Sequence, residues 1–227
     1  MSITDRHVTL YHNPRSRSKG VLILLEELGA DYALDRIDFA SGAQLAPAYP
    51  AINPMGKVPA IVHAAAVVTE QVAIYQYLAD LYPEAGLAPP IGDPRRGPYL
   101  RWLAFYGSAF EPALIDRALK REAPPRAMSP YADCDTVMGV VDDQLARGDY
   151  LLGAHCTAAD VPVGQRAGLD GRLRLARPAG VDPRLPRTHG GAAGGAARAE
   201  ERCRKRLNPW GAGRGRRTLA ADDWRRI

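Results

Sequence analysis

The sequence has few of the features that indicate a secreted, membrane-spanning or metal-binding protein. It contains three cysteines in 227 residues, and their spacing gives neither a CxxC pair nor a zinc site. Its longest run of large aliphatic residues, 21–25, is far shorter than the roughly 20 apolar residues that cross a bilayer. No apolar stretch near Asp5 and Arg6 resembles a signal peptide. We therefore expect a cytoplasmic protein with no metal and no membrane partner.

Acidic residues are scarce in the last third of the chain, and this scarcity alone makes the protein basic. Residues 162–227 contain 16 basic and 6 acidic residues, a net charge of +10, whereas residues 1–161 contain 14 basic and 19 acidic residues, a net charge of −5. An acidic main part does not favour nucleic acid as a partner. The basic part lacks the interleaved aromatic residues of nucleic-acid-binding segments, so such an arm is the weaker interpretation.

Residues 162–227 also lack Phe, Tyr and Met, and Arg, Gly and Ala dominate them. No helical or strand period continues through this segment, so we predict that it is poorly structured. We hypothesise that a reading-frame shift in a GC-rich gene produced it, because such shifts yield Arg, Gly, Ala and Pro. A continuous helical sequence in another frame of the coding DNA would support this origin, and its absence would exclude it.

The first 83 residues alternate between strand and helix signals. Runs rich in β-branched and alternating apolar residues predict strands, and apolar residues three and four apart predict helices. The predicted strands cover residues 8–11, 32–37, 58–62 and 66–68, and the predicted helices cover residues 20–28 and 70–82. The order β-α-β-β-β-α is that of a thioredoxin-like α/β domain.

Strand signals stop beyond a Pro- and Gly-rich linker at 84–92, and helix signals continue. Asp93 opens a long helix that Pro112 should kink. A second helix is predicted at about 131–147, and a capping box at Thr157–Asp160 predicts a third.

Pro162 follows that capping box inside the first turns of the third helix. A proline there interrupts a helix at a cost of about 3 kcal/mol. We therefore predict an all-helical domain over residues 93–161 that is truncated or disrupted after about residue 161.

Three motifs in the first part carry the chemistry. They are Asn53-Pro-Met-Gly-Lys-Val-Pro59, Glu70-Gln-Val-Ala-Ile74, and a serine-bearing loop at 12–18 that precedes Leu24-Leu-Glu-Glu-Leu-Gly29. In this order they resemble the glutathione S-transferase family, in its bacterial-type, serine-like, cytosolic form. The linker and the capping box resemble the helical second domain of that family.

The resemblance implies both a fold and an activity. The fold is a thioredoxin-like domain at 1–83 followed by an all-α domain. The activity is that of a homodimeric detoxification enzyme, which conjugates the thiolate of glutathione, its co-substrate, to an electrophilic small molecule. Glutathione-dependent isomerase, peroxidase or dehalogenase activity and a non-catalytic binding or regulatory role stay open, because one fold hosts several functions.

Val58 and Pro59 match the family position that binds the cysteinyl part of glutathione. In the family this proline is cis, as about 5–6% of X–Pro bonds are. The residue before it offers its backbone N–H and C=O to the extended tripeptide. The resemblance implies this role for Val58 and Pro59, and it places Lys57 near the glycyl end of the tripeptide.

Glu70 and Gln71 lie at a predicted helix N-terminus, where free N–H groups and the helix dipole favour an anion. The resemblance implies that Glu70 binds the ammonium of the γ-glutamyl end and that Gln71 binds its carboxylate. The family usually has Ser or Thr at the second position. The longer side chain of Gln71 is therefore expected to shift or weaken the site.

Ser16 and Ser18 are the candidates for the hydroxyl that stabilises the thiolate. A hydrogen bond to a charged group contributes ~1.5–3 kcal/mol, equivalent to a thiol pKa lowered by about one to two units. Ser16 matches the catalytic hydroxyl of serine-type members, and Ser18 is the alternative. Arg17 stands where cysteine-type members have their cysteine, which argues against mixed-disulfide chemistry. Arg15 and Arg17 are further candidates for stabilising the thiolate.

An aromatic stripe lies at helical spacing on the first helix of the second domain, and it comprises Tyr99, Trp102, Tyr106 and Phe110. Such a stripe suits a core between domains or a dimer surface as well as a ligand pocket. Of these residues, Tyr106 is predicted to line the hydrophobic acceptor site.

Overall fold

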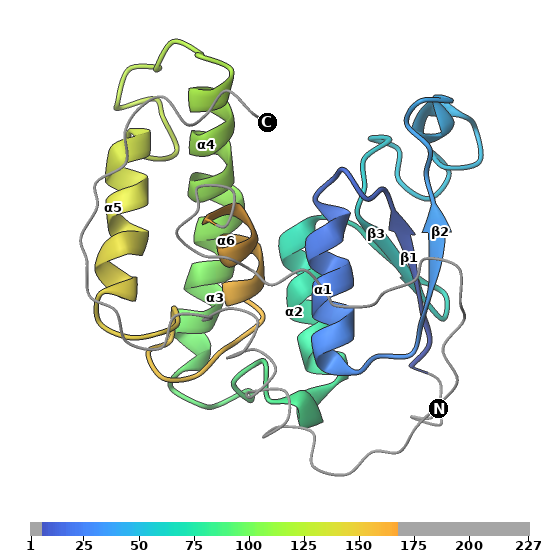
Figure 1. The fold of residues 1–227 in the computed structure, drawn as a ribbon, viewed down its shortest axis with the longest axis horizontal. Helices are drawn as coiled ribbons and strands as arrows, with labels where there is room; N and C mark the ends of the chain where they lie inside the picture. The colour runs from blue at the N-terminus through green and yellow to red at the C-terminus, as the bar shows by residue number, and fades with distance from the viewer. Residues whose placement is uncertain (1–5, 168–227) are drawn as a thin grey trace.

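A computed structural model of the chain describes residues 6–167 (Figure 1). A sheet and two helices, drawn in blue to blue-green, form one part of the molecule, and a group of helices drawn in green to orange forms the other. Most of the segment predicted to be poorly structured, from residue 168 onward, lies outside the described residues.

The first part is a four-stranded sheet in the order β2-β1-β3-β4. Its strands are β1 Val8–His12, β2 Tyr32–Arg36, β3 Ala60–His63 and β4 Ala66–Val68, and its helices are α1 Ser18–Leu28 and α2 Gln71–Leu81. Strand β1 is parallel to β2 and antiparallel to β3. Both helices lie on the side of the sheet that faces the helical part (Figure 1). The predicted thioredoxin-like domain is confirmed.

The residue pattern of β1 explains how the sheet is anchored. Successive side chains of a strand point to opposite faces. Val8, Leu10 and His12 are buried, and Thr9 and Tyr11 between them are partly exposed. The buried set includes one polar residue, His12, at the end of the strand that leads into the site.

The second part consists of helices within the described residues, apart from one isolated bridge between Tyr150 and Gly153. Its elements are α3 Arg96–Phe105, the π-helical segment η3 Tyr106–Phe110, α4 Glu111–Ala118, α5 Cys134–Leu145 and α6 Asp160–Ala167. Two short 3-10 turns complete the described chain, η1 Ala43–Leu45 and η2 Pro83–Ala85.

Segments α3, η3 and α4 follow one another without a break, and η3 carries the irregularity expected from Pro112. A proline has no N–H for the carbonyl four residues earlier, which here belongs to Ser108. The N–H of Glu111 bonds the carbonyl of Tyr106, five residues back, so the turn before the proline is widened. Sharp changes in a helix usually coincide with a proline or a π turn, and here both occur together.

Half of the predicted capping box before α6 is present: the Asp160 carboxylate bonds back to Thr157, but the Thr157 hydroxyl does not accept from the Asp160 N–H. The N–H and the hydroxyl of Thr157 donate to Asp160 Oδ2 at 2.8 and 2.9 Å, and the N–H of Leu151 donates to Oδ1 at 2.7 Å. The hydroxyl of Thr157 thus contacts the carboxylate, whereas the N–H of Asp160 bonds the Thr157 carbonyl at 3.0 Å. Three donors therefore converge on one buried carboxylate.

Pro162 does not interrupt α6, contrary to expectation. The helix begins at Asp160 and continues to Ala167, so Pro162 lies in its first turn. An N–H in the first turn has no acceptor within the helix, and a proline there costs little. The described helix therefore extends past the predicted boundary at residue 161.

The two parts approach each other closely where glycine replaces a side chain. A Cβ atom at Gly20 in α1 would lie 2.2 Å from the Tyr75 hydroxyl and 2.4 Å from Gln165 Oε1 of α6. A Cβ atom at Gly107 in η3 would lie 2.7 Å from Val72 of α2. These two glycines let α1 and α2 pack directly against the helical part.

Helices α5 and α6 are capped by an exposed and a buried aspartate, so the two caps can show how burial changes the contribution of a cap to the free energy of unfolding. Asp160→Ala leaves three buried donors unpaired, so we expect it to lower the free energy of unfolding by about 2–4 kcal/mol. Asp133→Ala removes the exposed N-cap of α5, which accepts from the N–H of Thr136 at 2.9 Å. We expect that loss to be about 1 kcal/mol. Urea unfolding of both variants tests this, and equal losses would contradict it.

Candidate functional site

Three separate segments meet at one edge of the sheet. Tyr11 pairs with Ala60 in the antiparallel ladder of β1 and β3, so the residues that follow β1 lie beside those that precede β3. The Gln71 amide donates to the Arg17 carbonyl at 3.4 Å, which brings the start of α2 to the loop between β1 and α1. The sequence motifs of this domain therefore converge in space.

The loop between β1 and α1 is held by Asn13. Its side-chain amide donates to the Ile37 carbonyl at 2.9 Å, and its Oδ1 accepts from the N–H of Arg15 at 2.9 Å. Its backbone N–H donates to Ser18 Oγ at 3.0 Å. The loop is thus fixed to the residue after β2 and to the first residue of α1.

Ser16 and Ser18 are brought together, but they differ in exposure. Their hydroxyl oxygens lie 2.7 Å apart. Ser18 is fully buried, and its Oγ lies 2.8 Å from Nδ1 of His12. Ser16 is partly exposed. Of the two predicted hydroxyls, Ser16 is the one that a ligand can reach.

His12 is the buried end of this group, with 5% of its surface exposed. Burial, together with the nearby positive charge of Arg36, lowers the pKa of His12 to about 4, although the hydrogen bond with Ser18 opposes the shift. The ring is therefore neutral at neutral pH, with one of its two nitrogens protonated. The alternation of Val8 and Leu10 indicates that position 12 is buried, yet a strand pattern gives no sign that its ring meets a serine across the loop.

The residues before β3 present a held backbone. The Val58–Pro59 peptide bond is cis, as the family resemblance implies. The carbonyl of Lys57 accepts from the Tyr49 hydroxyl at 2.6 Å and from the Asn53 side chain at 2.8 Å. Within residues 6–167, no backbone hydrogen bond uses the N–H or C=O of Val58. This backbone is therefore fixed in place with its own polar groups left for a ligand.

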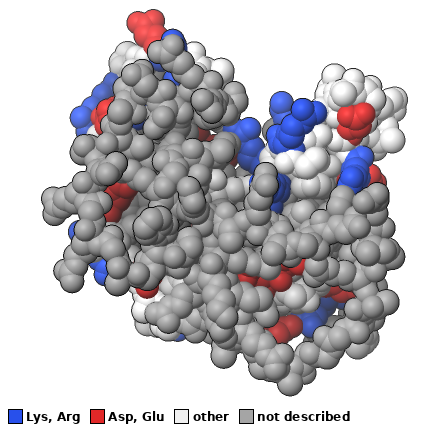
Figure 2. Space-filling view, in the orientation of Figure 1, with Lys and Arg blue, Asp and Glu red and all other residues white. Residues whose placement is uncertain are grey.

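The site segments also contribute positive charge. Arg15, Arg17 and Lys57 are exposed, and Lys57 makes no ion pair with another described residue. Figure 2 shows Lys and Arg atoms around the notch between the two parts of the molecule. An anionic ligand is favoured at this position.

Glu70 stands directly before α2 in an unusual backbone conformation. Its φ is 61° and its ψ is 117°, a region that non-glycine residues rarely occupy and that costs of order 1–3 kcal/mol. Its side chain is exposed and bonds to no other described residue. Strained residues of this kind cluster at ligand-binding positions.

Gln71 follows Glu70 but turns inward. Its Nε2 lies 3.2 Å from the Tyr75 hydroxyl, and its Oε1 accepts from the Tyr106 hydroxyl at 3.2 Å. Tyr75 is fully buried, which raises its pKa well above the usual value. The Gln71 side chain therefore joins α2 to the helical part. The backbone N–H groups at the start of α2 are the groups that could bind an anion there.

Tyr106 lies at the same junction, with 1% of its surface exposed. Its partners include Gln71 and, at 6.1 Å between ring centroids, Phe110. The acceptor-site role of Tyr106 stays a prediction that this burial does not favour.

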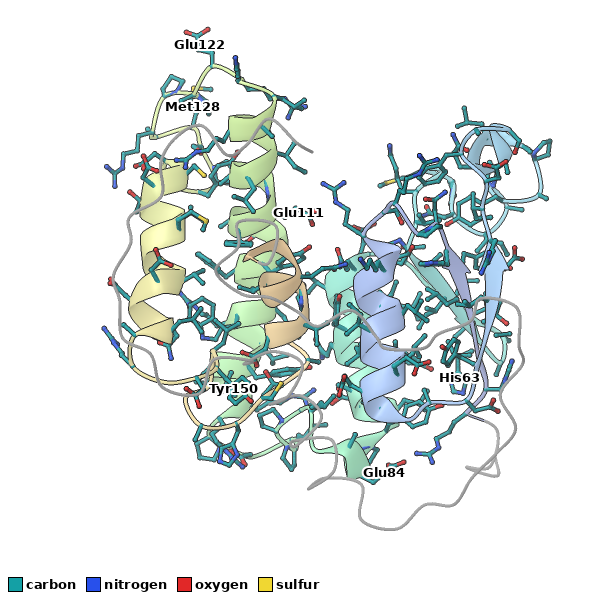
Figure 3. All side chains as sticks on the ribbon, in the orientation of Figure 1. His63, Glu84, Glu111, Glu122, Met128 and Tyr150 are labelled. Atoms are coloured by element: carbon teal, nitrogen blue, oxygen red, sulfur yellow. The ribbon has the colours of Figure 1, made fainter. Side chains whose placement is uncertain are left out.

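An ion pair that the sequence gave no reason to expect crosses between the two parts. Arg17 Nε lies 2.5 Å from Glu111 Oε1 at the start of α4, and the Glu111 side chain is 15% exposed. Figure 3 labels Glu111 on the side of the helical part that faces α1. Because the two residues are far apart in the sequence, no local pattern could indicate this contact. By the family resemblance, Arg17 stands at the position where cysteine-type members have their cysteine.

Among residues 6–167, no group of three or more His, Cys, Asp or Glu side chains is arranged to hold a metal ion. Within the same range no helix has both the length and the apolar character to cross a membrane.

Comparison with known proteins points to one family. Residues 6–80 match the family model described as Glutathione S-transferase, N-terminal domain. Glutathione S-transferase 3 of Zea mays is 32% identical over 151 residues, which are 62% of this chain and 67% of the relative. A glutathione transferase from Methylococcus capsulatus has a TM-score of 0.59 and 31% identity over 72% of this chain and 82% of its own. A Sulfitobacter glutathione transferase homologue with bound glutathione has a TM-score of 0.57 and 30% identity over 73% and 84%.

The pKa shifts of the buried residues His12 and Asp160 predict opposite changes in the free energy of unfolding as the pH falls. Between pH 6.5 and about 4 the unfolded chain protonates His12 and the folded chain does not, so this residue makes stability fall as the pH falls. Burial raises the pKa of Asp160 from 3.8 to about 6, so the folded chain takes up that proton first and stability rises as the pH falls.

Urea unfolding between about pH 7 and pH 5 separates these two contributions. Relative to the wild type, we expect His12→Asn to lose less stability on acidification and Asp160→Asn to lose more. Parallel pH profiles for all three proteins would contradict both assignments.

Proposed function

The chain belongs to the glutathione S-transferase family, and from this we propose that it binds glutathione and transfers its thiolate to an electrophilic small molecule. The observation that carries the proposal is the convergence of the Val58 backbone, the start of α2 and the Ser16 hydroxyl at one sheet edge. The glutathione bound to the Sulfitobacter homologue supports the ligand.

The cysteinyl part of glutathione is proposed to pair with Val58. An extended peptide can bind to unpaired main-chain groups through backbone hydrogen bonds, and Val58 lies just before β3 with its backbone N–H and C=O unpaired among the described residues. The two hydrogen bonds on the Lys57 carbonyl hold this backbone, so little ordering remains for the ligand to impose. The Lys57 ammonium then pairs with the glycyl carboxylate.

The γ-glutamyl end is proposed to lie at the start of α2. Its ammonium pairs with the exposed carboxylate of Glu70, and its carboxylate accepts from the first backbone N–H groups of the helix. Gln71 takes part through its backbone, since its side chain is engaged with Tyr75 and Tyr106. This differs from the side-chain role that the family resemblance implies for that position.

Ser16 is proposed as the residue that stabilises the thiolate. It is partly exposed where Ser18 is buried, and it follows the strand that leads into the site. Its O–H donates to the sulfur, which lowers the thiol pKa by about one to two units. The thiolate then attacks the electrophilic carbon, a C–S bond forms, and the electron pair leaves with the displaced group or takes up a proton. Arg15, in the same loop, adds positive charge.

Three further parts of the proposal follow from the family. The protein acts in the cytoplasm, it forms a homodimer, and its acceptor site lies next to the helical part near Tyr106. Exposed apolar side chains on both parts, such as Met55 (63%) and Met128 (79%), support a protein contact.

A second candidate function is glutathione binding without catalysis. The inward turn of Gln71 favours it, because the side chain that the family usually offers to the ligand is here part of the domain contact. Retention of the full-length chain on immobilised glutathione, with no turnover of any electrophile in a panel, would support this role over the transferase.

Glu70 can be tested with a matched exposed glutamate. We expect Glu70→Gln to weaken glutathione binding about tenfold or more, since a hydrogen bond between charged groups contributes ~1.5–3 kcal/mol. Glu122→Gln, at the far end of the helical part (Figure 3), should leave the affinity unchanged. Isothermal titration measures both, and equal affinities would remove Glu70 from the site.

We expect Ser16→Ala and Ser18→Ala to have different effects, the first on the thiol pKa and the second on stability. Ser16→Ala is expected to raise the pKa of the bound thiol by about one to two units, and hence to lower turnover at neutral pH about ten- to hundredfold. Ser18→Ala should lower the free energy of unfolding, because it removes the buried acceptor of the Asn13 N–H. A larger effect on the thiol from Ser18→Ala would assign the direct role to Ser18.

A further inference from the structure

A chain of hydrogen bonds runs from the buried end of β1 to the site. It begins at Nδ1 of His12, reaches Ser18 Oγ after 2.8 Å, and reaches Ser16 Oγ after another 2.7 Å. His12 and Ser18 are buried, and Ser16 is partly exposed. No motif in the sequence assigns His12 a role, and the proposed thiolate chemistry uses only the last member of the chain.

The hydrogen-bonding capacity of Ser18 restricts how its proton is used. A hydroxyl has one proton to donate and two lone pairs to accept with. The N–H of Asn13 occupies one lone pair at 3.0 Å. The other neighbours are His12 Nδ1, Ser16 Oγ and, at 3.0 Å, the Asn13 carbonyl. One of them must donate to Ser18, and one must accept from it.

The Asn13 carbonyl cannot accept both hydroxyl protons. It already accepts the N–H of Ser16 at 3.1 Å, which leaves one lone pair. Ser16 Oγ lies 2.8 Å from this carbonyl and is the nearer of the two hydroxyls. The proton of Ser18 therefore goes to His12 or to Ser16, and the state of the His12 ring decides which.

The two neutral forms of His12 give opposite directions to the chain. If Nδ1 carries no proton, Ser18 donates to it, and Ser18 keeps a free lone pair that competes with a ligand for the proton of Ser16. If Nδ1 carries the proton, His12 donates to Ser18 and Ser18 donates to Ser16. Ser16 then accepts from Ser18 and from the N–H of Ser18 at 3.2 Å. Without a ligand its own proton goes to the Asn13 carbonyl at 2.8 Å. A thiolate draws this proton away from the carbonyl, because hydrogen bonds to ionised groups are about twice as strong as those between neutral groups.

We propose that His12 is a positioning residue, protonated at Nδ1, which orients the hydroxyls of Ser18 and Ser16 outward so that Ser16 donates to the thiolate. This inference rests on the proposed function, because the thiolate is that of bound glutathione. Consecutive hydrogen bonds polarise one another, so the chain also strengthens the donor at its exposed end. The residue acts through two others and never touches the ligand.

The test compares His12→Leu with His12→Asn in the full-length protein. The side-chain amide of asparagine can place a donor near the Nδ1 position, whereas leucine has none. The ultraviolet absorbance of the thiolate, followed against pH, gives the thiol pKa of bound glutathione. We expect His12→Leu to raise this pKa by about one unit, a tenfold loss of thiolate at a fixed pH below it. We expect His12→Asn to restore most of the shift.

The control ligand is S-methylglutathione, which has no ionisable thiol. Its affinity should be the same for the wild type and both variants, since His12 does not contact the tripeptide. An unchanged thiol pKa in His12→Leu would overturn the role of His12 and leave the proposed function intact. A wild-type protein that binds neither ligand would overturn the proposed function and this inference together.

A measurement on the wild type covers the case in which His12→Leu does not fold. Nitrogen-15 chemical shifts of the imidazole distinguish the two neutral forms, and the signals of His12 among the five histidines are those that vanish in His12→Asn. The proposal requires the form protonated at Nδ1. A proton found on Nε2 would overturn it.

Discussion

The structure depends on the way the buried hydroxyl of Ser18 closes the turn from β1 to α1. This one oxygen accepts from the Asn13 backbone and contacts both His12 and Ser16. Leaving a buried polar group without a partner costs more free energy than a hydrogen bond usually contributes. The hydrogen bonds that join His12, Asn13, Ser16 and Ser18 therefore form or break as one group. The path of the chain out of the central strand, and with it the direction of the site loop, follows from that requirement.

The second requirement is the contact between the two parts. Gln71, Tyr75 and Tyr106 form a hydrogen-bonded polar group at the junction, and Arg17 and Glu111 extend it to the loop of the site. Residues next to the proposed thiolate position are thus bonded to the helical part directly. A change in how the parts pack would move the site loop and the start of α2 at the same time.

The sequence predicts the local elements of this fold well, because strand alternation, helical spacing and caps are properties of neighbouring residues. The cis bond at Pro59 is what the family resemblance of the motif at 53–59 implies. Other features depend on residues far apart in the chain, such as the Arg17–Glu111 pair and the inward turn of Gln71. The usual effect of a proline inside a helix predicts that Pro162 interrupts α6, whereas its place in the first turn makes it harmless.

The π-helical turn at Tyr106–Phe110 has a consequence for which residues the helical part can present. A π turn is an α-helix with one residue inserted, and each residue advances an α-helix by about 100°. Helix α4 is therefore rotated about the helix axis by about 100° relative to its orientation in a continuous α-helix without the extra residue. With this rotation, Glu111 faces Arg17 and α4 packs against α5. An ideal helix one residue shorter would present a different side of α4 to the site.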